Sequence, residues 1–275
     1  MVTLRQIDSL DIPELNFYRS MKYSPEQNID GIFIGEGEKV VLQILKSPHM
    51  VLSGLMIEKY YFRLKNLLES RSEHIEIFLA TKEILKDITG YKYYQGVLLM
   101  GKLEHRFSLQ EAWGKTKSPR FFFALDELAN PENVGGIIRS AAAFGVQAVI
   151  VGSRCCSPWL RRSIRSSVGN VFNVIVVDNV DICNTFDWLR SKGMEIAAAH
   201  PHSLSYVLGE YSWSGKDLCL VVGNEGQGLS EEVLRHCSHS IRIPMSNEVD
   251  SLNVASSSAV FLYDIWRQRQ KYNLR

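Results

Sequence analysis

The sequence predicts an α/β protein in which a parallel sheet, covered by helices on both faces, follows a smaller α/β domain. Two observations support this fold class. After residue 118, short apolar runs alternate with amphipathic stretches, which is the pattern of the strand–helix units that build parallel sheets. A polar segment containing Lys115, Lys117 and Pro119 separates this half from the first hundred residues. We therefore expect domains over 1–105 and 119–275, joined by a linker over 106–118.

The first domain mixes strands and helices. The stretch GIFIGEGEKVVLQIL predicts a short strand, a Gly-rich turn and an amphipathic helix. Further strands are expected at VLSGLMI, HIEIFLA and GVLLMG, with a helix at KYYFRLKNLLESR. The pattern indicates a small α/β domain.

The second domain alternates more regularly. Strands are expected at 121–126, 148–152, 174–177, 194–199, 218–223 and 239–243. Helices are expected at 134–144, 157–167, 181–192, 230–236 and 253–271. Ligands of parallel sheets bind at the carboxyl ends of the strands, so the loops that follow strands are the places to look for function.

Composition restricts the class of protein. No run approaches the roughly 18 apolar residues that a membrane span needs, and the N-terminus has no signal-peptide pattern. Five irregularly spaced cysteines indicate neither a disulfide framework nor a zinc site, so a cytoplasmic protein without a metal is expected. The net charge of +1 does not by itself indicate nucleic acid.

Residues 133–177 nevertheless contain no Asp or Glu. A local basic surface of this kind is compatible with phosphate binding, and a chance gap in acidic residues is the alternative. The arginines in this stretch are Arg139, Arg154, Arg161, Arg162 and Arg165.

Three loops that follow predicted strands carry unusual residues. In the first, Asn133 stands where a helix N-cap belongs, Gly135 and Gly136 leave the helix surface bare, and Arg139 follows. The alternative is an ordinary capped helix with one solvated arginine. The second loop, GNEGQGLS over 223–230, is Gly-rich, but its spacing is not that of a dinucleotide-binding loop. The third runs from Ile243 through VDSLNVA and opens a helix rich in small residues.

Together and in this order, the loops resemble the three signature motifs of the SpoU/TrmH family of RNA ribose methyltransferases, within the SPOUT superfamily. The matching blocks are NPENVGGIIRSAAAFG, SPWLRRSIRSSVGNVF, GNEGQGLS and IPMSNEVDSLNVASSSAV. The resemblance covers about 120–272. The first domain more weakly resembles an L30e-like RNA-binding domain, and GEGEKVV is its best-matching stretch.

The resemblance implies a deep trefoil knot in the second domain, S-adenosylmethionine as cofactor, and a homodimer formed through the last helix. It implies that backbone groups at Gly223, Ile243 and Leu252 bind the cofactor. Residues aligned with the family's catalytic set are Asn133, Arg139, Glu225, Ser251 and Asn253.

The resemblance casts Arg139 as the acceptor of the proton from the reacting ribose hydroxyl. A guanidinium stays protonated well above neutral pH, so we expect it to bind the ribose and the adjacent phosphate; proton transfer through a phosphate is the alternative to direct proton acceptance. Asn133 and Glu225 are expected to orient Arg139 and the ribose, and Ser251 and Asn253 to shape the loop and the cofactor end of the site. Arg154, Arg161, Arg162 and Arg165 are candidates for phosphate contacts with RNA.

The target is expected to be structured RNA, rRNA in preference to tRNA, methylated on a ribose 2′-hydroxyl. Two alternatives remain: a base-methylating SPOUT enzyme, and a catalytically silent RNA-binding or assembly protein. His200 and His202 flank Pro201 and resemble half a metal site, but no second half exists in the sequence, so we interpret them as loop residues.

Overall fold

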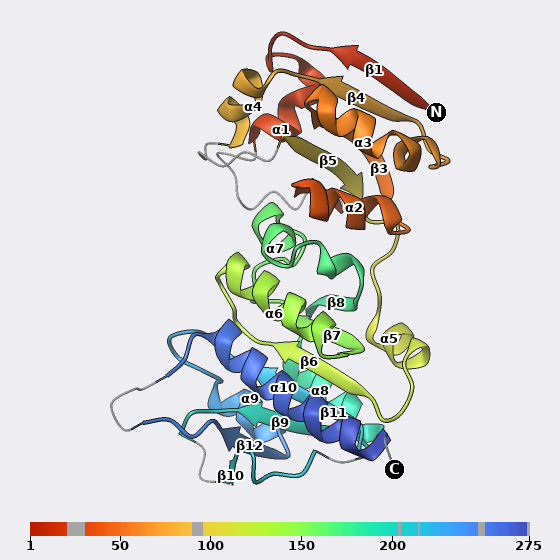
Figure 1. Cartoon of the computed structure of the whole chain (residues 1–275). Coiled ribbons are helices and arrows are strands. Elements are labelled where there is room, and N and C mark those ends of the chain that lie inside the picture. The colour runs from red at the N-terminus through yellow and green to blue at the C-terminus, as the bar shows by residue number, and fades with distance from the viewer. Residues whose placement is uncertain (21–30, 90–95, 203–204, 214, 247–250, 274–275) are drawn as a thin grey trace. The chain divides into compact units, whose positions relative to one another are not determined.

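The structure is a computed structural model that describes residues 1–20, 31–89, 96–202, 205–213, 215–246 and 251–273 (Figure 1). The chain divides into two compact units. Unit 1 contains Met1–His105 and Trp159–Asn173, and unit 2 contains Arg106–Pro158 and Val174–Arg275.

Unit 1 is built on a five-stranded mixed sheet in the order β1-β4-β3-β5-β2. The β1, β4 and β3 strands are parallel to one another, while β5 runs antiparallel to both β3 and β2. The predicted strands and helices of this region are present, and β1, α1 and α4 add to them. The elements are β1 (Val2–Gln6), η1 (Pro13–Leu15), α1 (Asn16–Ser20), β2 (Ile32–Glu36), α2 (Glu38–Lys46), β3 (Met50–Met56), α3 (Glu58–Glu69), β4 (Ile75–Leu79), α4 (Lys82–Thr89), β5 (Val97–Lys102), α7 (Arg161–Ser166) and η2 (Asn170–Phe172).

The inclusion of Trp159–Asn173 in unit 1 differs from our prediction, which assigned this segment to the second domain. Its aromatic rings pack among those of unit 1: the Phe172 ring centroid lies 5.0 Å from that of Phe33 and 5.8 Å from that of His49. Gly169, at φ +77°, allows a close approach to α2, because a Cβ there would lie 2.9 Å from Gln43 Cβ. These packing contacts join segments that are distant in the sequence, so no local pattern within Trp159–Asn173 predicts them.

Unit 2 is built on a seven-stranded sheet in the order β10-β12-β9-β11-β6-β7-β8, and every neighbouring pair in it is parallel. This confirms the predicted parallel sheet. The central strands β6 and β11 are buried along their whole length, as strands covered on both faces must be. The elements are α5 (Leu109–Lys115), β6 (Phe121–Leu125), α6 (Pro131–Ala143), β7 (Ala148–Gly152), β8 (Ile175–Val180), α8 (Ile182–Ser191), β9 (Glu195–Ala199), β10 (Tyr206–Val207), β11 (Leu218–Val222), α9 (Glu231–His236), β12 (His239–Arg242) and α10 (Val254–Asn273).

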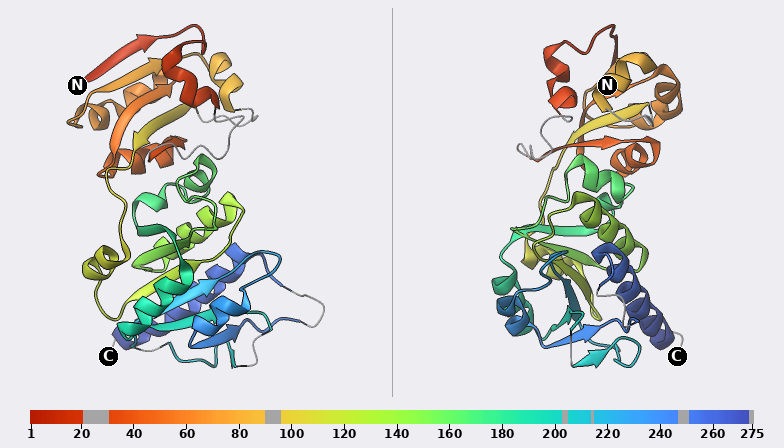
Figure 2. Two further views of the ribbon diagram at one scale, coloured as in Figure 1. Left: turned by 180° about the vertical axis from the view of Figure 1, so that it is seen from behind. Right: turned by 90° about the vertical axis from the view of Figure 1, so that its left-hand side faces the viewer.

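Helices cover both faces of this sheet, as predicted. The α6 and α10 helices lie side by side on one face, and α8 and α9 lie on the other (Figure 2). Close packing of α10 on α6 depends on small residues, because a Cβ at Gly136 would lie 3.4 Å from Ala255 Cβ. The bare helix surface at Gly136 therefore faces α10.

The predicted linker 106–118 contains a helix, α5. Ser108 and Glu111 form a capping box at its N-terminus, in which each side chain accepts from the backbone N–H of the other residue. Trp113 from α5 packs edge-on against Trp188 of α8, with ring centroids 5.7 Å apart. This segment is part of the core of unit 2.

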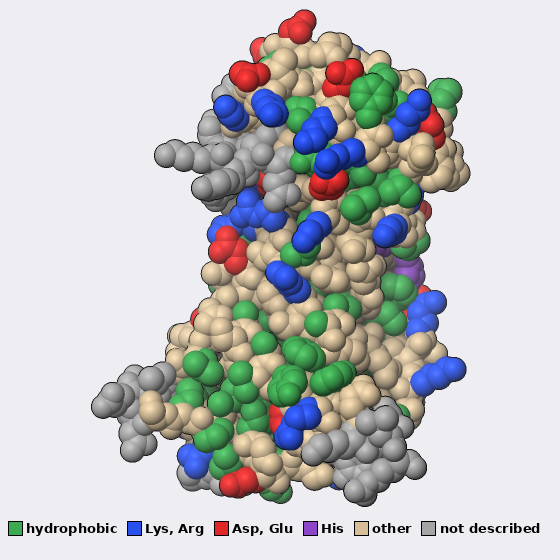
Figure 3. Space-filling view, viewed as in Figure 1, with side chains coloured by type: hydrophobic (Ala, Val, Ile, Leu, Met, Phe, Trp, Pro, Cys, Tyr) green, Lys and Arg blue, Asp and Glu red, His purple; other side chains and the backbone are tan. Residues whose placement is uncertain are grey.

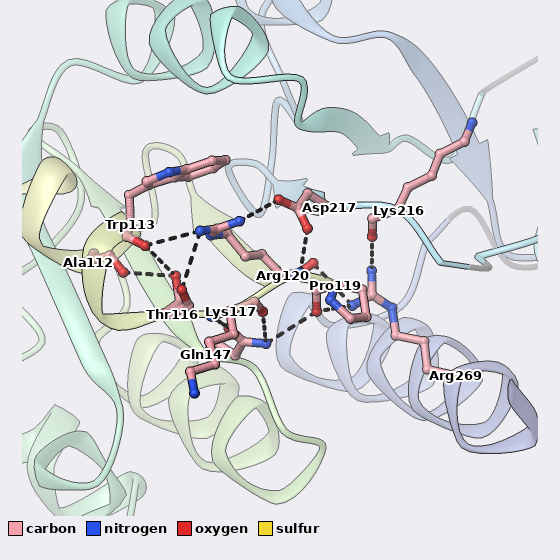
Figure 4. A network of polar contacts seen from close by, with 10 residues as sticks. All are labelled: Ala112, Trp113, Thr116, Lys117, Pro119, Arg120, Gln147, Lys216, Asp217 and Arg269. Carbon is pink, nitrogen blue, oxygen red and sulfur yellow. Dashed lines mark hydrogen bonds and ion pairs between the residues drawn. The ribbon is translucent and has the colours of Figure 1, made fainter. Parts of the chain in front are cut away.

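Polar contacts of two arginines connect the start of β6 to other segments of unit 2 (Figure 4). Arg120 stacks on the Trp113 ring at 3.8 Å and forms an ion pair with Asp217 at 2.8 Å. Arg269 of α10 donates to the backbone carbonyls of Pro119, Arg120 and Lys216. Burial lowers the pKa of Arg269 to about 10, which still leaves it charged at neutral pH. The C-terminal half of α10 is thereby held at the edge of the sheet where β6 begins.

Candidate active site

The three loops singled out in the sequence meet at one edge of the unit 2 sheet. They follow β6, β11 and β12, and these strands are neighbours apart from β9, which lies between β11 and β12. Because all the strands are parallel, their carboxyl ends lie at the same edge. Strand direction and strand order together bring the loops into contact.

The Gly-rich loop after β11 is closed on itself. The backbone N–H of Asn224 donates to Gly228 O at 3.0 Å, and the Gly228 N–H donates back at 2.9 Å. The Asn224 side-chain oxygen accepts from the backbone N–H groups of Gly226 and Gln227. A Cβ at Gly223 would lie 2.5 Å from Gly228 O, so only glycine fits beneath this turn.

A hydrogen-bond chain joins the three loops. Asn133 Nδ2 donates to Glu225 Oε1 at 2.9 Å, and Asn253 Nδ2 donates to Asn133 Oδ1 at 3.1 Å. Asn133 has 9% of its surface exposed, whereas Glu225 and Asn253 are exposed. The buried amide thus holds two exposed polar side chains in place. These two hydrogen bonds bring together three of the five predicted catalytic residues.

Asn133 does not serve as the N-cap of α6, contrary to our prediction. The helix begins two residues earlier, at Pro131, and Asn130 accepts from the backbone N–H of Glu132 at 2.8 Å. Proline suits the first helical position, so the helix start moves ahead of Asn133. The Asn133 side chain is consequently available to the other loops. Asn253, in contrast, does cap α10, by accepting from Ala255 N–H and Ser256 N–H.

A cavity of about 500 Å³ opens beside this chain. It is lined by the whole Gly223–Gly228 loop, by Ser251–Val254, and by the segment after β9. A second cavity of about 80 Å³ shares Ser251, Leu252 and His200 with it and adds Ile243 and Phe261. The three predicted cofactor positions, Gly223, Ile243 and Leu252, therefore line two adjoining cavities.

Those cavities fit a nucleoside that carries a polar tail. Pockets for ligands of that size typically have volumes of roughly 300–1,000 Å³ and are apolar with a few polar groups. The smaller cavity offers apolar side chains from Ile241, Ile243 and Phe261, and the larger one offers the bared backbone of the Gly-rich loop. His200 lines both and has a buried, unpaired Nδ1 among the described residues.

The sequence interpretation missed the segment after β9. His200 and His202, which we took for loop residues, line the larger cavity with Ala199 and Pro201. Their position after a strand of the sheet was the available signal. Among the residues that the structure describes, no group of three His, Cys, Asp or Glu side chains is placed to bind a metal ion.

Arg139 lies on an exposed part of α6. Within the described ranges, no hydrogen bond or ion pair of its side chain occurs, and it lines neither cavity. Asn133 and Glu225 bond to each other and not to Arg139, so the expected orientation of this guanidinium by those two residues is absent here.

The four candidate RNA-binding arginines fall in different environments. Arg154 has 63% of its side chain exposed and pairs with Glu127 at 2.7 Å in unit 2. Arg161, in unit 1, is only 15% exposed and forms an ion pair with the buried Glu36 at 2.7 Å. Arg165 lies 3.8 Å from the same carboxylate. The structure gives Arg161 a structural role, and groups Arg162 and Arg165 with it on α7.

Comparisons with known proteins agree with these observations. The profile of the SpoU rRNA Methylase family matches residues 120–263, just over half of the chain. An uncharacterized tRNA/rRNA methyltransferase of Mycobacterium bovis is 29% identical, over 92% of this chain and 88% of its own length. A 23S rRNA (guanosine(2553)-2′-O)-methyltransferase of Bacillus subtilis is 24% identical, over 95% and 99%.

Solved structures share the fold. The AdoMet-bound rRNA methyltransferase from Sinorhizobium meliloti superposes with a TM-score of 0.82 at 22% identity, covering 96% of this chain and 98% of that one. At this identity the likeness shows the fold alone. It extends over both units of the chain.

Proposed function

Because the chain belongs to the SpoU rRNA Methylase family, we propose that it transfers a methyl group from S-adenosylmethionine to a ribose 2′-hydroxyl of structured RNA. Membership makes it an RNA methyltransferase that uses this cofactor; the ribose oxygen and the preference for rRNA over tRNA are the proposed part. The Asn133–Glu225–Asn253 chain beside the larger cavity is the observation that carries the proposal. The Bacillus subtilis relative, named for a 2′-O-methylation of 23S rRNA, supports it.

Gly223, Ile243 and Leu252 hold the cofactor in this proposal. The cofactor supplies a methyl group bonded to a positively charged sulfur. The apolar side chains of the smaller cavity suit its adenine ring, and the backbone of the Gly-rich loop can bond its polar groups. Ser251 lines both cavities and shapes their common wall.

Arg139 binds the RNA ribose and its neighbouring phosphate. Its exposed side chain is available for these contacts, and a guanidinium that donates to the hydroxyl oxygen stabilises the negative charge that develops as the proton passes through the neighbouring phosphate to water. The guanidinium itself remains protonated. Asn133 and Glu225 hold the mouth of the cavity in one arrangement, so that the hydroxyl enters in line with the transferable methyl group. Asn253 fixes the start of α10 in the same arrangement.

Arg154 is the strongest candidate for a further phosphate contact. It follows β7 at the carboxyl edge of the sheet, and its largely exposed pair with Glu127 contributes little stability. An incoming phosphate can therefore compete with Glu127 for this guanidinium.

A second copy of the chain covers α10 in the proposed homodimer. Phe261, Leu262 and Ile265 are buried within the subunit, yet hydrophobic side chains also gather on the outer surface of α6 and α10 (Figure 3). An apolar outer surface on a helix that is already packed indicates an interface. The exposed members are Val260, Tyr263 and Trp266, which are 41%, 51% and 38% exposed.

Two features of the fold are proposed from the same family resemblance. The sheet order, with β12 separated from β11 by β9, is compatible with the threading of a deep trefoil knot in unit 2. The mixed sheet of unit 1, with α2 directly after β2, is compatible with an L30e-like RNA-binding domain. No helix in the described part of the chain is both long and apolar enough to cross a membrane. We place the protein in the cytoplasm, in keeping with the relative that is named for methylation of 23S rRNA.

Mass spectrometry of nucleosides tests the function. Ribosomal RNA lacking the modification is incubated with the protein and isotopically labelled S-adenosylmethionine, then digested to nucleosides. We expect label on a 2′-O-methylated nucleoside, and no label with Arg139→Ala, which should still bind the cofactor. Label on a base would replace the ribose assignment. Absence of label from rRNA and tRNA alike would favour a silent RNA-binding protein. Maps of rRNA methylation with and without the gene identify the nucleotide.

A further inference from the structure

His200 lies where the two cavities of unit 2 meet. It directly follows β9, and its backbone N–H donates to Ile241 O of β12 at 3.0 Å. This bond holds the residue against the neighbouring strand. Its side chain lines the larger cavity together with Gly223, and the smaller one together with Ile243.

The imidazole of His200 has an unused polar atom. Its Nδ1 is shielded from solvent and has no hydrogen-bond partner among the described residues. The ring of His202 lies nearby, with its centroid 5.9 Å from that of His200 and the two ring planes nearly perpendicular. Buried polar atoms are nearly always paired, so an unpaired one on a cavity wall calls for a group that arrives with a ligand.

We propose that His200 is a cofactor-binding residue, whose Nδ1 hydrogen-bonds the nucleoside part of S-adenosylmethionine. The proposal rests on the cofactor site described above. The nucleoside is favoured because His200 touches the apolar cavity that suits an adenine ring as well as the polar one beside it. A hydroxyl or amino group of the nucleoside that lies where the two cavities meet can be reached by the His200 side chain.

The protonation state of His200 is consistent with this contact. Burial lowers the pKa of the imidazole, and the neighbouring His202 lowers it further. At neutral pH the ring is therefore uncharged, can both donate and accept a hydrogen bond, and places no positive charge beside the sulfonium. Among the described residues that line the cavities, His202 and Glu225 are the other titratable groups.

Calorimetric binding of S-adenosylmethionine and S-adenosylhomocysteine to the full chain tests the proposal. His200→Phe keeps a planar ring and removes Nδ1, and we expect about 10-fold weaker binding of both ligands. His200→Asn keeps a polar atom near the position of Nδ1 and should recover most of the affinity. His74→Asn, at an exposed position in unit 1 that lines neither cavity, is the control and should stay within about 2-fold.

Unchanged binding by His200→Phe overturns the proposal, and so does a loss confined to S-adenosylmethionine, since both ligands carry the nucleoside. If the unaltered protein binds neither ligand, the proposed cofactor site is itself wrong, which is a separate outcome. Thermal unfolding of each variant shows whether the chain is folded, and His200→Ala, which also removes Nδ1, takes the place of His200→Phe if the latter does not fold.

Discussion

Asn133 and Glu225 are 92 residues apart in the sequence, yet the amide of one donates to the carboxylate of the other at 2.9 Å. The bond ties the first turn of α6 to the Gly-rich loop after β11. If this tie positions the reacting groups, Asn133→Ala should lower the rate of methyl transfer about 100-fold, because a small misplacement of reacting groups has an effect of that size.

Single-turnover methyl transfer with labelled cofactor measures this rate, and calorimetry should show cofactor affinity changed by less than about 5-fold. Glu132→Ala, at an exposed position one residue earlier, is the control. A rate for Asn133→Ala equal to that of the unaltered protein would remove this bond from the mechanism.

Gly223 and Gly226 offer a matched pair of substitutions in one loop. A Cβ at Gly223 meets backbone atoms of Gly228 and Leu229 at 2.5–2.7 Å, whereas one at Gly226 meets only the Asn224 side chain at 3.6 Å. Gly223→Ala should therefore destabilise the protein by about 1–3 kcal/mol and weaken cofactor binding. Gly226→Ala should change stability by less than about 0.5 kcal/mol. Denaturant unfolding and calorimetry measure both, and equal effects would contradict the geometry.

Substitution of Arg161 should lower the stability of the protein, whereas substitution of Arg154 should weaken its binding to RNA. Arg161→Met leaves the buried Glu36 carboxylate without its closest partner and should lower the free energy of unfolding by about 3–5 kcal/mol. Arg154→Ala removes an exposed pair and should cost less than about 1 kcal/mol. It should instead weaken RNA binding and reduce the slope of log K against log salt by about 1. A salt slope unchanged by Arg154→Ala would show that this guanidinium is only solvated.

The outer face of α10 predicts the oligomeric state. Tyr263→Asp puts a charge among exposed apolar side chains, 6.2 Å between ring centroids from Trp266, and should convert a dimer to a monomer. Analytical ultracentrifugation at micromolar concentration measures this. Phe62→Asp is the control, since Phe62 is 64% exposed on α3. A monomeric unaltered protein would rule out the dimer.

We expect the buried position of His239 to make the protein less stable in acid. Burial lowers the pKa of its imidazole, while Glu195 raises it and Lys216 lowers it; Tyr206 and Tyr211 pack against the ring. The unfolded chain then binds more protons just below the ordinary histidine pKa of about 6.5, so this contribution is complete above pH 6.5 and is lost as the pH falls below it.

Thermal unfolding at pH 7.5 and pH 5.5 measures the effect. His239→Gln should reduce the fall in Tm between these values without abolishing it, because the pKa values of His49 and His200 are also lowered by burial. His74→Gln, at an exposed position, is the control. If the Tm of His239→Gln fell between pH 7.5 and pH 5.5 as much as that of the unaltered protein, His239 would not be a source of the loss of stability in acid.

The sequence by itself determined the strand–helix alternation of unit 2 and the three loops that follow β6, β11 and β12. These depend on local patterns: buried strands are continuous apolar runs, and glycine and Asx residues mark the turns. The family resemblance of these loops also identified Asn133, Glu225 and Asn253, which hydrogen bonds join in the structure. The predicted positions Gly223, Ile243 and Leu252 likewise line adjoining cavities.

Only the tertiary structure decided the environment of each side chain. Arg161 carries the same charge whether it faces phosphate or a buried carboxylate, and Glu36, its partner, lies 125 residues away. The sequence left His200 as a loop residue because it offered no second half for a metal site, and the position of His200 depends on pairing between β9 and β12. Such contacts form between segments that are distant in the chain, so a local pattern of residues does not predict them.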